Sequence, residues 1–416
     1  MERTDTVIVG GGQAGLATSY FLTQYGREHV ILEQAARAGN TWRTARWDSF
    51  TLVTPNWTVK LPGGEYEGPD RDGYMPRDEI AGYLERYAER IKAPVLYDTN
   101  VVSVESVDGK GYLIQTNERT FGANNVVMAT GFERLPKIPP SATSLSPEVK
   151  QLHSSKYRNP QSLPTGAVLV VGSAQSGCQI AEELYQSGRQ VFLCTGGAGR
   201  VPRRYRGKDV VERLYQIGFF NMTPDKLPVP REHFAPPHVS GKNGGRTLNL
   251  HQFARDGVTL LGHFRAAAGD KVSVAPDLPQ NLAKADGFDL EILKMVDDYI
   301  RANGLDAPEE ELPRLRDGFE QPIIEELDLR GAGINTVVWA TGYRPDFGVL
   351  RLPVLDREGF PIQASGVGLH PGLYFVGMPF MPSLKTGTLM GVGESARHVV
   401  DDIAGGRAFR EGRPAA

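Results

Sequence analysis

The chain contains little cysteine and no long apolar run. Cys178 and Cys194 are the only cysteines among 416 residues, and they form no Cys-x-x-Cys pair. This excludes a disulfide-rich secreted scaffold and favours a reducing compartment. No stretch approaches the ~20 apolar residues of a membrane-spanning helix, and the N-terminus lacks the pattern of a signal peptide. We therefore expect a cytoplasmic protein without a membrane partner.

Charge of one sign is also lacking. The sequence has 46 basic and 49 acidic residues, for a net charge of −3, so the chain as a whole attracts neither nucleic acid nor an anionic membrane. We expect a small-molecule substrate and no nucleic-acid partner. A length of 416 residues is typical of two domains or of one interleaved pair.

Two glycine-rich turns are the strongest positive signal. The first follows the apolar run Val7-Ile8-Val9 and reads Gly10-Gly11-Gly12-Gln13-Ala14-Gly15. The second follows Val168-Leu169-Val170-Val171 and reads Gly172-Ser173-Ala174-Gln175-Ser176-Gly177. In each, a β-branched run leads into a tight turn and a helix, a context in which backbone N–H groups bind a pyrophosphate. The sequence predicts an α/β fold with two Rossmann-like dinucleotide-binding domains.

Periodicity gives the order of elements. We expect strands at 6–9, 30–33, 101–107, 112–115, 125–129, 190–194, 336–340 and 372–377, and helices at 15–25, 77–91 and 388–403. Two strands end in the same triplet, first Ala129-Thr130-Gly131 and later Ala340-Thr341-Gly342. This echo suggests that the chain leaves the first domain, builds the second and returns. We predict a first domain at 1–160, a second at 161–333 with an irregular inserted region, and a return segment at 334–416.

An acidic residue completes the first turn motif. Glu33 ends the second predicted strand, where a carboxylate can accept hydrogen bonds from ribose hydroxyls. Shortly after it, the segment Gly39-Asn40-Thr41-Trp42-Arg43 offers hydroxyl, indole and guanidinium groups to a second phosphate or a flavin ring.

The second turn motif lacks this acid. Cys194-Thr195 stands in its place, and Arg200, Arg203 and Arg204 follow. Because a guanidinium fork suits a 2′-phosphate better than a ribose diol, this loop favours NADPH over NADH. The alternative is a solvated basic loop, which fits Arg206 best. If the arginines bind the phosphate, replacing Arg203 and Arg204 with alanine raises KM for NADPH far more than for NADH.

With these features in this order, the chain resembles the flavin-containing monooxygenases, a class that includes the YUCCA-type and Baeyer–Villiger enzymes. The family segment Phe-x-Gly-x-x-x-His-x-x-x-Tyr/Phe is present in its second half as His153 and Tyr157, whereas Pro147 and Val149 replace the Phe and Gly. The resemblance implies a glutathione-reductase-like interleaved topology, with FAD on the first turn and NADPH on the second. It further implies a reduced flavin that adds O₂ at C4a and transfers one oxygen atom.

The resemblance also implies site residues. A polar group beside the flavin peroxide would be Asn56 or Thr54, although either residue also suits a turn cap. Gly377 would let backbone approach the flavin side chain. Together with the turn residues, the expected cofactor contacts include Gln34, Thr41, Trp42, Arg43, Val102, Ala129, Thr130, Gly131, Thr195, Ala340, Thr341, Gly342 and Thr388.

Several alternatives remain open at this point. The oxygen acceptor is expected to be a nitrogen or sulfur atom, but Baeyer–Villiger chemistry and α-keto-acid decarboxylation are alternatives. An NADPH oxidase, a flavin-linked quinone reductase and a regulatory flavoprotein without turnover fit the same motifs. Dimers are common for this architecture, so a homodimer is one expectation. The spacings of His233, His238, His251 and His263 match no metal-ligand pattern, and no metal is expected.

Overall fold

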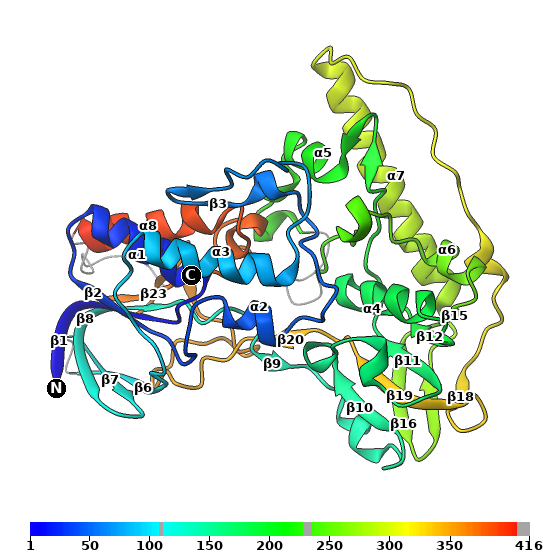
Figure 1. The fold of residues 1–416 in the computed structure, drawn as a ribbon, viewed down its shortest axis with the longest axis horizontal. Coiled ribbons are helices and arrows are strands. Elements are labelled where there is room, and N and C mark those ends of the chain that lie inside the picture. The colour runs from blue at the N-terminus through cyan, green and yellow to red at the C-terminus, as the bar shows by residue number, and fades with distance from the viewer. Residues whose placement is uncertain (108–110, 228–233, 406–416) are drawn as a thin grey trace.

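The computed structural model describes residues 1–107, 111–227 and 234–405. Figure 1 shows two α/β lobes joined by extended segments. In the first lobe, five parallel strands follow the order β23-β8-β1-β2-β5. Their bounds are Leu373–Phe375, Thr120–Met128, Glu2–Val9, His29–Leu32 and Val95–Leu96. The edge strands β22 (Val367–Gly368) and β21 (Gln363–Ala364) extend this sheet. Strand β7 (Tyr112–Thr116) pairs antiparallel with β8, and β6 (Val101–Ser106) pairs antiparallel with β7.

The second lobe repeats this arrangement. Its parallel sheet follows the order β10-β19-β11-β12-β15. The bounds are Lys150–His153, Ile334–Trp339, Ala167–Val171, Val191–Cys194 and Thr259–Leu261. Strand β11 corresponds to β1, β12 to β2, and β19 to β8, because each occupies the same place in its sheet. The predicted pair of Rossmann-like domains is therefore confirmed.

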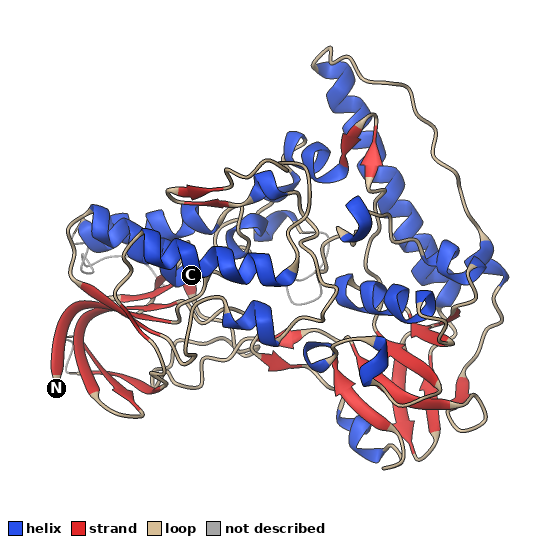
Figure 2. Ribbon diagram, viewed as in Figure 1, coloured by secondary structure: helices blue, strands red, loops and turns tan. Residues whose placement is uncertain are grey.

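Burial explains the composition of the central strands. All five residues of β11 are buried, and so are the last four of β1, as expected for parallel strands covered on both faces. Helices α1 (Gln13–Gln24), α3 (Arg77–Arg90) and α8 (Val392–Ala404) lie on one side of the first sheet, and α4 (Gln175–Gln186) packs on β11 and β12 (Figure 2). Helix α8 begins at Val392 rather than at 388, because residues 388–391 form a turn that follows the 3₁₀ segment Leu384–Gly387.

The inserted region between the two halves of the second sheet contains the longest helix. Helix α7 (Leu278–Ala302) has 25 residues, about 37 Å at 1.5 Å per residue, and it reaches away from the second sheet in Figure 1. The smaller elements are α2 (Asn40–Thr44), α5 (Val210–Gln216), α6 (Leu250–Arg255), β3 (Lys60–Leu61), β4 (Gly64–Glu65), β13 (Arg204–Tyr205), β14 (Lys208–Asp209), β16 (Phe264–Ala268), β17 (Lys271–Val274) and β18 (Glu326–Asp328).

The predicted domain boundaries need correction. Strands β10 and β19 both pair within the second sheet, although the boundaries 1–160 and 334–416 would place them in the first domain. The repeated Ala-Thr-Gly triplet marks the same position in each domain, directly after the strand beside the glycine turn, rather than a return to the first domain. The chain crosses instead at β9 (Leu135–Pro136) and β20 (Tyr343–Arg344), which pair antiparallel.

The partial family segment stabilises this crossing. The amide of Lys137 donates to the carbonyl of Gly342 at 2.9 Å, and the buried His153 ring makes a 3.0 Å hydrogen bond to the same oxygen. Tyr157 is fully buried and donates to Glu183 of α4 at 2.8 Å. His153 therefore holds the crossing segment, whereas Tyr157 anchors helix α4 of the second domain. Across the described ranges, no helix is both long and apolar enough to span a bilayer.

Candidate active site

The two glycine turns have the same geometry. A Cβ atom on Gly10 would stand 2.7 Å from the Ala129 carbonyl oxygen, and one on Gly172 would stand 2.6 Å from that of Ala340. At the last glycine of each turn, a Cβ would lie 2.0 Å and 1.8 Å from the carbonyl oxygen of the first. Backbone thus occupies the space of a side chain at both ends of each turn, which explains why glycine is required there. Each Ala-Thr-Gly triplet borders one turn.

Both turns leave a helix N-terminus open. Gly12 is the N-cap of α1 and Ala174 that of α4, and no side chain in the described parts of the chain caps either helix. A Cβ on Gly12 would meet nothing within 4 Å. The first N–H groups of both helices are therefore left without a side-chain cap at the positive end of the helix dipole, an arrangement that binds a pyrophosphate.

Glu33 and Thr130 add polar groups to the first turn. The Glu33 carboxylate accepts hydrogen bonds from the amides of Gly11 at 2.7 Å and Ala35 at 2.8 Å. The Thr130 hydroxyl oxygen is buried without a hydrogen-bond partner among the described residues. A Cβ on Gly377 would lie 2.5 Å from the Cβ of Ala14, so the late segment passes directly over the start of α1. The open N-terminus and the unpartnered hydroxyl fit a dinucleotide such as FAD.

The two glutamines of the turns each fasten a distant segment. Gln13 Nε2 donates to the carbonyl of Gly387 at 3.0 Å. Gln175 donates to the Val239 carbonyl at 2.6 Å and accepts from the Val239 amide at 3.2 Å. The side chains of both glutamines thus bind backbone atoms of other segments, which leaves their backbone amides to bind a cofactor. Ser176, beside Gln175, is half-buried.

The segment after Glu33 differs from the prediction. Arg43 makes a 2.9 Å ion pair with Glu85 of α3, so its guanidinium is already used within the domain and the predicted phosphate contact is not supported. The centroids of the Trp42 and Phe50 rings lie 5.9 Å apart. The Arg46 guanidinium carbon lies over the Trp42 ring, 5.3 Å from its centroid. Four other predicted cofactor contacts have exposed side chains here, namely Gln34, Thr41, Val102 and Thr388.

Asn56, the first predicted catalytic residue, makes hydrogen bonds within the protein in this structure. Its side chain is 3% exposed; Nδ2 donates to the Asp70 carbonyl and Oδ1 accepts from the Met75 amide, both at 2.8 Å. Both side-chain polar atoms hold the 70–75 segment, which fits the turn-anchoring interpretation, and the second Nδ2 proton is left for another partner. The half-buried Thr54 hydroxyl shares a 2.9 Å hydrogen bond with the Thr58 hydroxyl, whose own proton is donated to the Pro55 carbonyl at 2.7 Å, so Thr54 stays a candidate as a hydrogen-bond acceptor.

Arg203 also has a different role from the one predicted. Its side chain is 3% exposed and forms an ion pair with Asp209, and Nη1 donates to the Val53 carbonyl at 2.8 Å. A 2′-phosphate could reach it only if the pair with Asp209 broke, at a large cost in desolvation. Arg203 instead connects the second domain to the loop that contains Thr54.

The other two arginines are also directed elsewhere. Arg200 forms ion pairs with Asp286 at 2.9 Å and Asp289 at 2.7 Å, so two carboxylates offset its charge. Arg204 is exposed and donates to the Gly244 carbonyl at 3.1 Å. Neither guanidinium contacts the end of β12 among the interactions that the structure describes, and the predicted arginine fork is not assembled.

Helix α7 lies where the fork was expected. Asn281 of this helix donates to the Thr195 hydroxyl at 3.1 Å, and that hydroxyl donates to the Leu261 carbonyl at 2.7 Å. Thr195 is thereby buried and used in packing. Sequence reasoning missed this helix because 86 positions separate the two partners and no motif links them.

The two cysteines are inert. Both are buried and free, and burial raises the pKa of the Cys194 thiol to about 12. The Cys178 thiol, whose pKa is also raised by burial, donates to the Ser173 carbonyl at 3.0 Å. Because a thiolate is the reactive form, neither residue can act as the redox pair of a disulfide reductase.

The histidines occupy separate environments. His251 bonds Asp286 at 3.1 Å and sits in α6, whose N-cap Asn249 accepts from its amide as predicted. His263 bonds Asp277 at 2.7 Å. His233 lies outside the described residues. Within the ranges that the structure covers, no three metal-ligating side chains of the His, Cys, Asp and Glu types form a group suited to a metal ion.

His238 is expected to make stability depend on pH. It is fully buried, and burial together with the charge of Arg200 lowers its pKa to about 4. The unfolded imidazole, with a pKa near 6.5, binds a proton first as the pH falls, so stability is lost below about pH 6.5 and by about 2 kcal/mol at pH 5. His238→Gln should therefore lose less stability between pH 7.5 and 5 in urea unfolding; an undiminished loss would contradict this origin.

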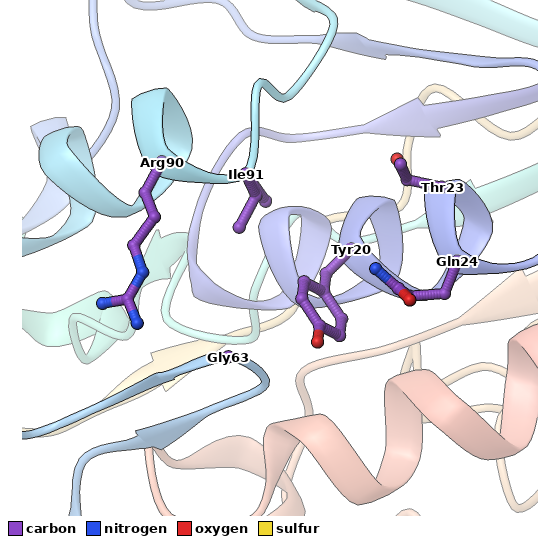
Figure 3. A pocket seen from close by; sticks show the side chains of 6 residues that line it. All are labelled: Tyr20, Thr23, Gln24, Gly63, Arg90 and Ile91. Carbon is purple, nitrogen blue, oxygen red and sulfur yellow. The ribbon is translucent and has the colours of Figure 1, made fainter.

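A surface cavity lies apart from both turns. It has a volume of about 290 Å³ and is lined by Tyr20, Thr23, Gln24, Gly63, Arg90 and Ile91 (Figure 3). The three α1 residues among them belong to the C-terminal half of that helix, whereas the glycine turn precedes its N-terminus. This cavity is therefore not the dinucleotide site.

Comparison with known proteins agrees with this geometry. Residues 7–216 match the family model described as pyridine nucleotide-disulphide oxidoreductase. An uncharacterized CzcO-like oxidoreductase from Geobacillus kaustophilus is 32% identical over 96% of this chain and 98% of its own length. Flavin-containing monooxygenase 1 from Oryctolagus cuniculus is 27% identical over 54% of this chain and 46% of its own.

Solved structures show the same fold. The flavin-containing monooxygenase from Stenotrophomonas maltophilia superposes with a TM-score of 0.67 at 21% identity, covering 97% of this chain and 99% of that one. OTEMO, solved in complex with FAD and NADP, gives a TM-score of 0.54 at 15% identity, over 96% of this chain and 85% of that one. The chain belongs to the pyridine nucleotide-disulphide oxidoreductase family, and it is similar to flavin-containing monooxygenases in sequence and in fold.

Proposed function

We propose that this protein is an FAD- and NADPH-dependent monooxygenase that transfers one oxygen atom of O₂ to a nitrogen or sulfur atom of a small organic substrate. One observation carries the proposal: two matched turns in one chain, each with an uncapped helix N-terminus, of which the first alone is followed by a ribose-binding acid. The relatives named above support the assignment of oxygen transfer.

The residues divide between two cofactors. The amides of Gln13, Ala14 and Gly15 would hold the FAD pyrophosphate, Glu33 its ribose and the Thr130 hydroxyl a further acceptor. The amides at the start of α4 would hold the pyrophosphate of NADPH. When bound, FAD supplies storage for two electrons and the reaction with O₂.

The chain itself would position the cofactors and exclude water. Gln13 holds the 384–387 turn against the first helix, and Leu384 of this turn belongs to an apolar cluster that also contains Phe219, Phe380 and Met390. This cluster joins the late segment of the first domain to the inserted region of the second. Apolar cover beside the first turn would protect a reactive oxygen species from water.

Rapid mixing tests oxygen transfer directly. We expect that NADPH-reduced protein mixed with O₂ passes through an absorbing species distinct from reduced and oxidised flavin, which persists for seconds and shortens when the right amine or thioether is present. Immediate return to oxidised flavin, with hydrogen peroxide released in equal amount, would contradict the proposal and favour an NADPH oxidase. Reduction of quinones without oxygen uptake would favour a quinone reductase, and yellow protein that NADPH fails to reduce would favour a regulatory flavoprotein.

A further inference from the structure

The two domains differ at the position that distinguishes NADH from NADPH. In the first domain, Glu33 follows the second strand and its carboxylate accepts from the Gly11 amide. In the second, Ser173 replaces Gly11, and its hydroxyl oxygen accepts from the Gly196 amide at 2.9 Å. Two glycines therefore border the ribose end of the second site: Gly196, which is half-buried, and Gly197, which is exposed. No acidic residue stands at the end of β12, where Glu33 stands in the first domain.

A lysine of helix α7 lies beside Gly197, at the ribose end of the second site. Lys284 lies against Gly197: a Cβ placed on that glycine would stand 3.0 Å from Nζ and 3.5 Å from Cδ and Cε. Lys284 is exposed, and within the described part of the chain it forms no ion pair. Its neighbour on the same face of α7, three positions earlier, is Asn281, which fixes the helix to Thr195.

His263 borders the other glycine. Its Nε2 atom would be 3.5 Å from a Cβ on Gly196, while Asp277 accepts from its amide at 2.8 Å and bonds Nδ1 at 2.7 Å. Partial burial acts to raise the pKa of Asp277, but hydrogen bonds from the amide and ring of His263 outweigh it and lower that pKa. The Asp277 carboxylate is therefore occupied in orienting the ring toward the glycines.

We propose that Lys284, with His263 beside it, binds the 2′-phosphate of NADPH and determines the preference for NADPH over NADH. The inference rests on the proposed use of NADPH and replaces the arginine loop as the source of selectivity. The Lys284 ammonium group has no counterion among the described residues and lies against Gly197, which lacks a side chain, so it leaves both room and charge for a phosphate. The selectivity would then come from an inserted helix rather than from the strand end itself.

Ligand binding tests this assignment without turnover. The probes are 2′,5′-ADP and 5′-AMP, titrated calorimetrically into the FAD-loaded protein. We expect Lys284→Gln to weaken 2′,5′-ADP binding by about 10- to 100-fold, the range for a lost charge-assisted hydrogen bond, and to leave 5′-AMP binding unchanged. The matched control is Lys294→Gln, an exposed lysine of the same helix paired with Asp298, which should change neither.

A second variant and the wild type complete the test. Gly197→Asp places a carboxylate beside Lys284 and should weaken 2′,5′-ADP while sparing 5′-AMP. Unchanged 2′,5′-ADP binding in both variants would overturn the role of Lys284 and leave the use of NADPH standing. Wild-type protein that binds the two probes equally would contradict NADPH selectivity altogether, and would separate failure of the proposed cofactor from failure of the lysine.

Discussion

Gly12→Asp is expected to yield a folded but colourless protein, whereas Ala174→Asp yields a yellow protein that dithionite reduces and NADPH does not. The two residues are the N-caps of α1 and α4. A side chain at Gly12 meets no protein atom, so the chain can accept aspartate there. Because aspartate is a favourable N-cap, the cofactor-free protein should be no less stable, and Ala174→Asp should gain about 1 kcal/mol.

The loss of cofactor has two physical sources. The new carboxylate accepts the helix N–H groups that a pyrophosphate would use, and it places a negative charge next to the phosphates. A single like-charge pair at 4 Å costs about 4 kcal/mol near a protein surface, on the order of a 1000-fold weaker binding. Flavin content, measured by absorbance after purification and after incubation with FAD, reads out the first turn. Anaerobic flavin reduction by NADPH reads out the second.

Neutral isosteres provide the control. Gly12→Asn and Ala174→Asn cap the same helices without the charge and should lose clearly less cofactor affinity than the aspartates. Full flavin content in Gly12→Asp would show that FAD is not held at the first turn. If NADPH reduced the flavin of Ala174→Asp as fast as that of the wild type, NADPH would not be held at the second turn. That result would contradict the division of cofactors between the domains.

The glycine turns were predictable from sequence because local backbone sterics decide them. Gly10 and Gly15 must lack side chains since a carbonyl oxygen occupies that space, and this constraint acts within a few residues. The same holds for Glu33, which follows its strand directly and contacts the turn amide. Both Rossmann-like domains and the family followed from these local signals.

Side chains whose partners are distant were not predictable. Arg203 sits in a basic loop that matches a phosphate site in composition, but its partners Val53 and Tyr74 come from the other domain. The hydrogen bonds of Asn56 with the 70–75 segment could not be inferred from its place in the sequence. Lys284 carries no motif, since its position depends on how α7 packs against Thr195. The domain boundary at 334 was wrong because the two triplets mark equivalent strands, a relation that appears only in the sheet order.

Arg203→Ala is expected to destabilise the protein by about 3 kcal/mol or more and to change KM for NADPH and NADH by the same factor. The guanidinium pairs with Asp209 and lies 4.7 Å from the centroid of the Tyr74 ring, while the Tyr74 hydroxyl donates to Asp209 at 2.5 Å. Removing it leaves the Asp209 carboxylate, which is 11% exposed, without its cation, and breaking a buried pair costs about 3 to 5 kcal/mol.

The control variants separate an interdomain contact from a phosphate ligand. Arg204→Ala removes an exposed guanidinium with one carbonyl contact and should cost less than about 0.5 kcal/mol. In the double variant Arg203→Met/Asp209→Asn, no unpaired charge remains and the introduced amide can still cap α5 as the Asp209 carboxylate does, so we expect part of the lost stability to return. Urea unfolding of the FAD-loaded protein measures these differences. Because Arg203 also holds the Val53 carbonyl next to Thr54, its loss should release more hydrogen peroxide per NADPH. A selective rise in KM for NADPH would instead support the phosphate role.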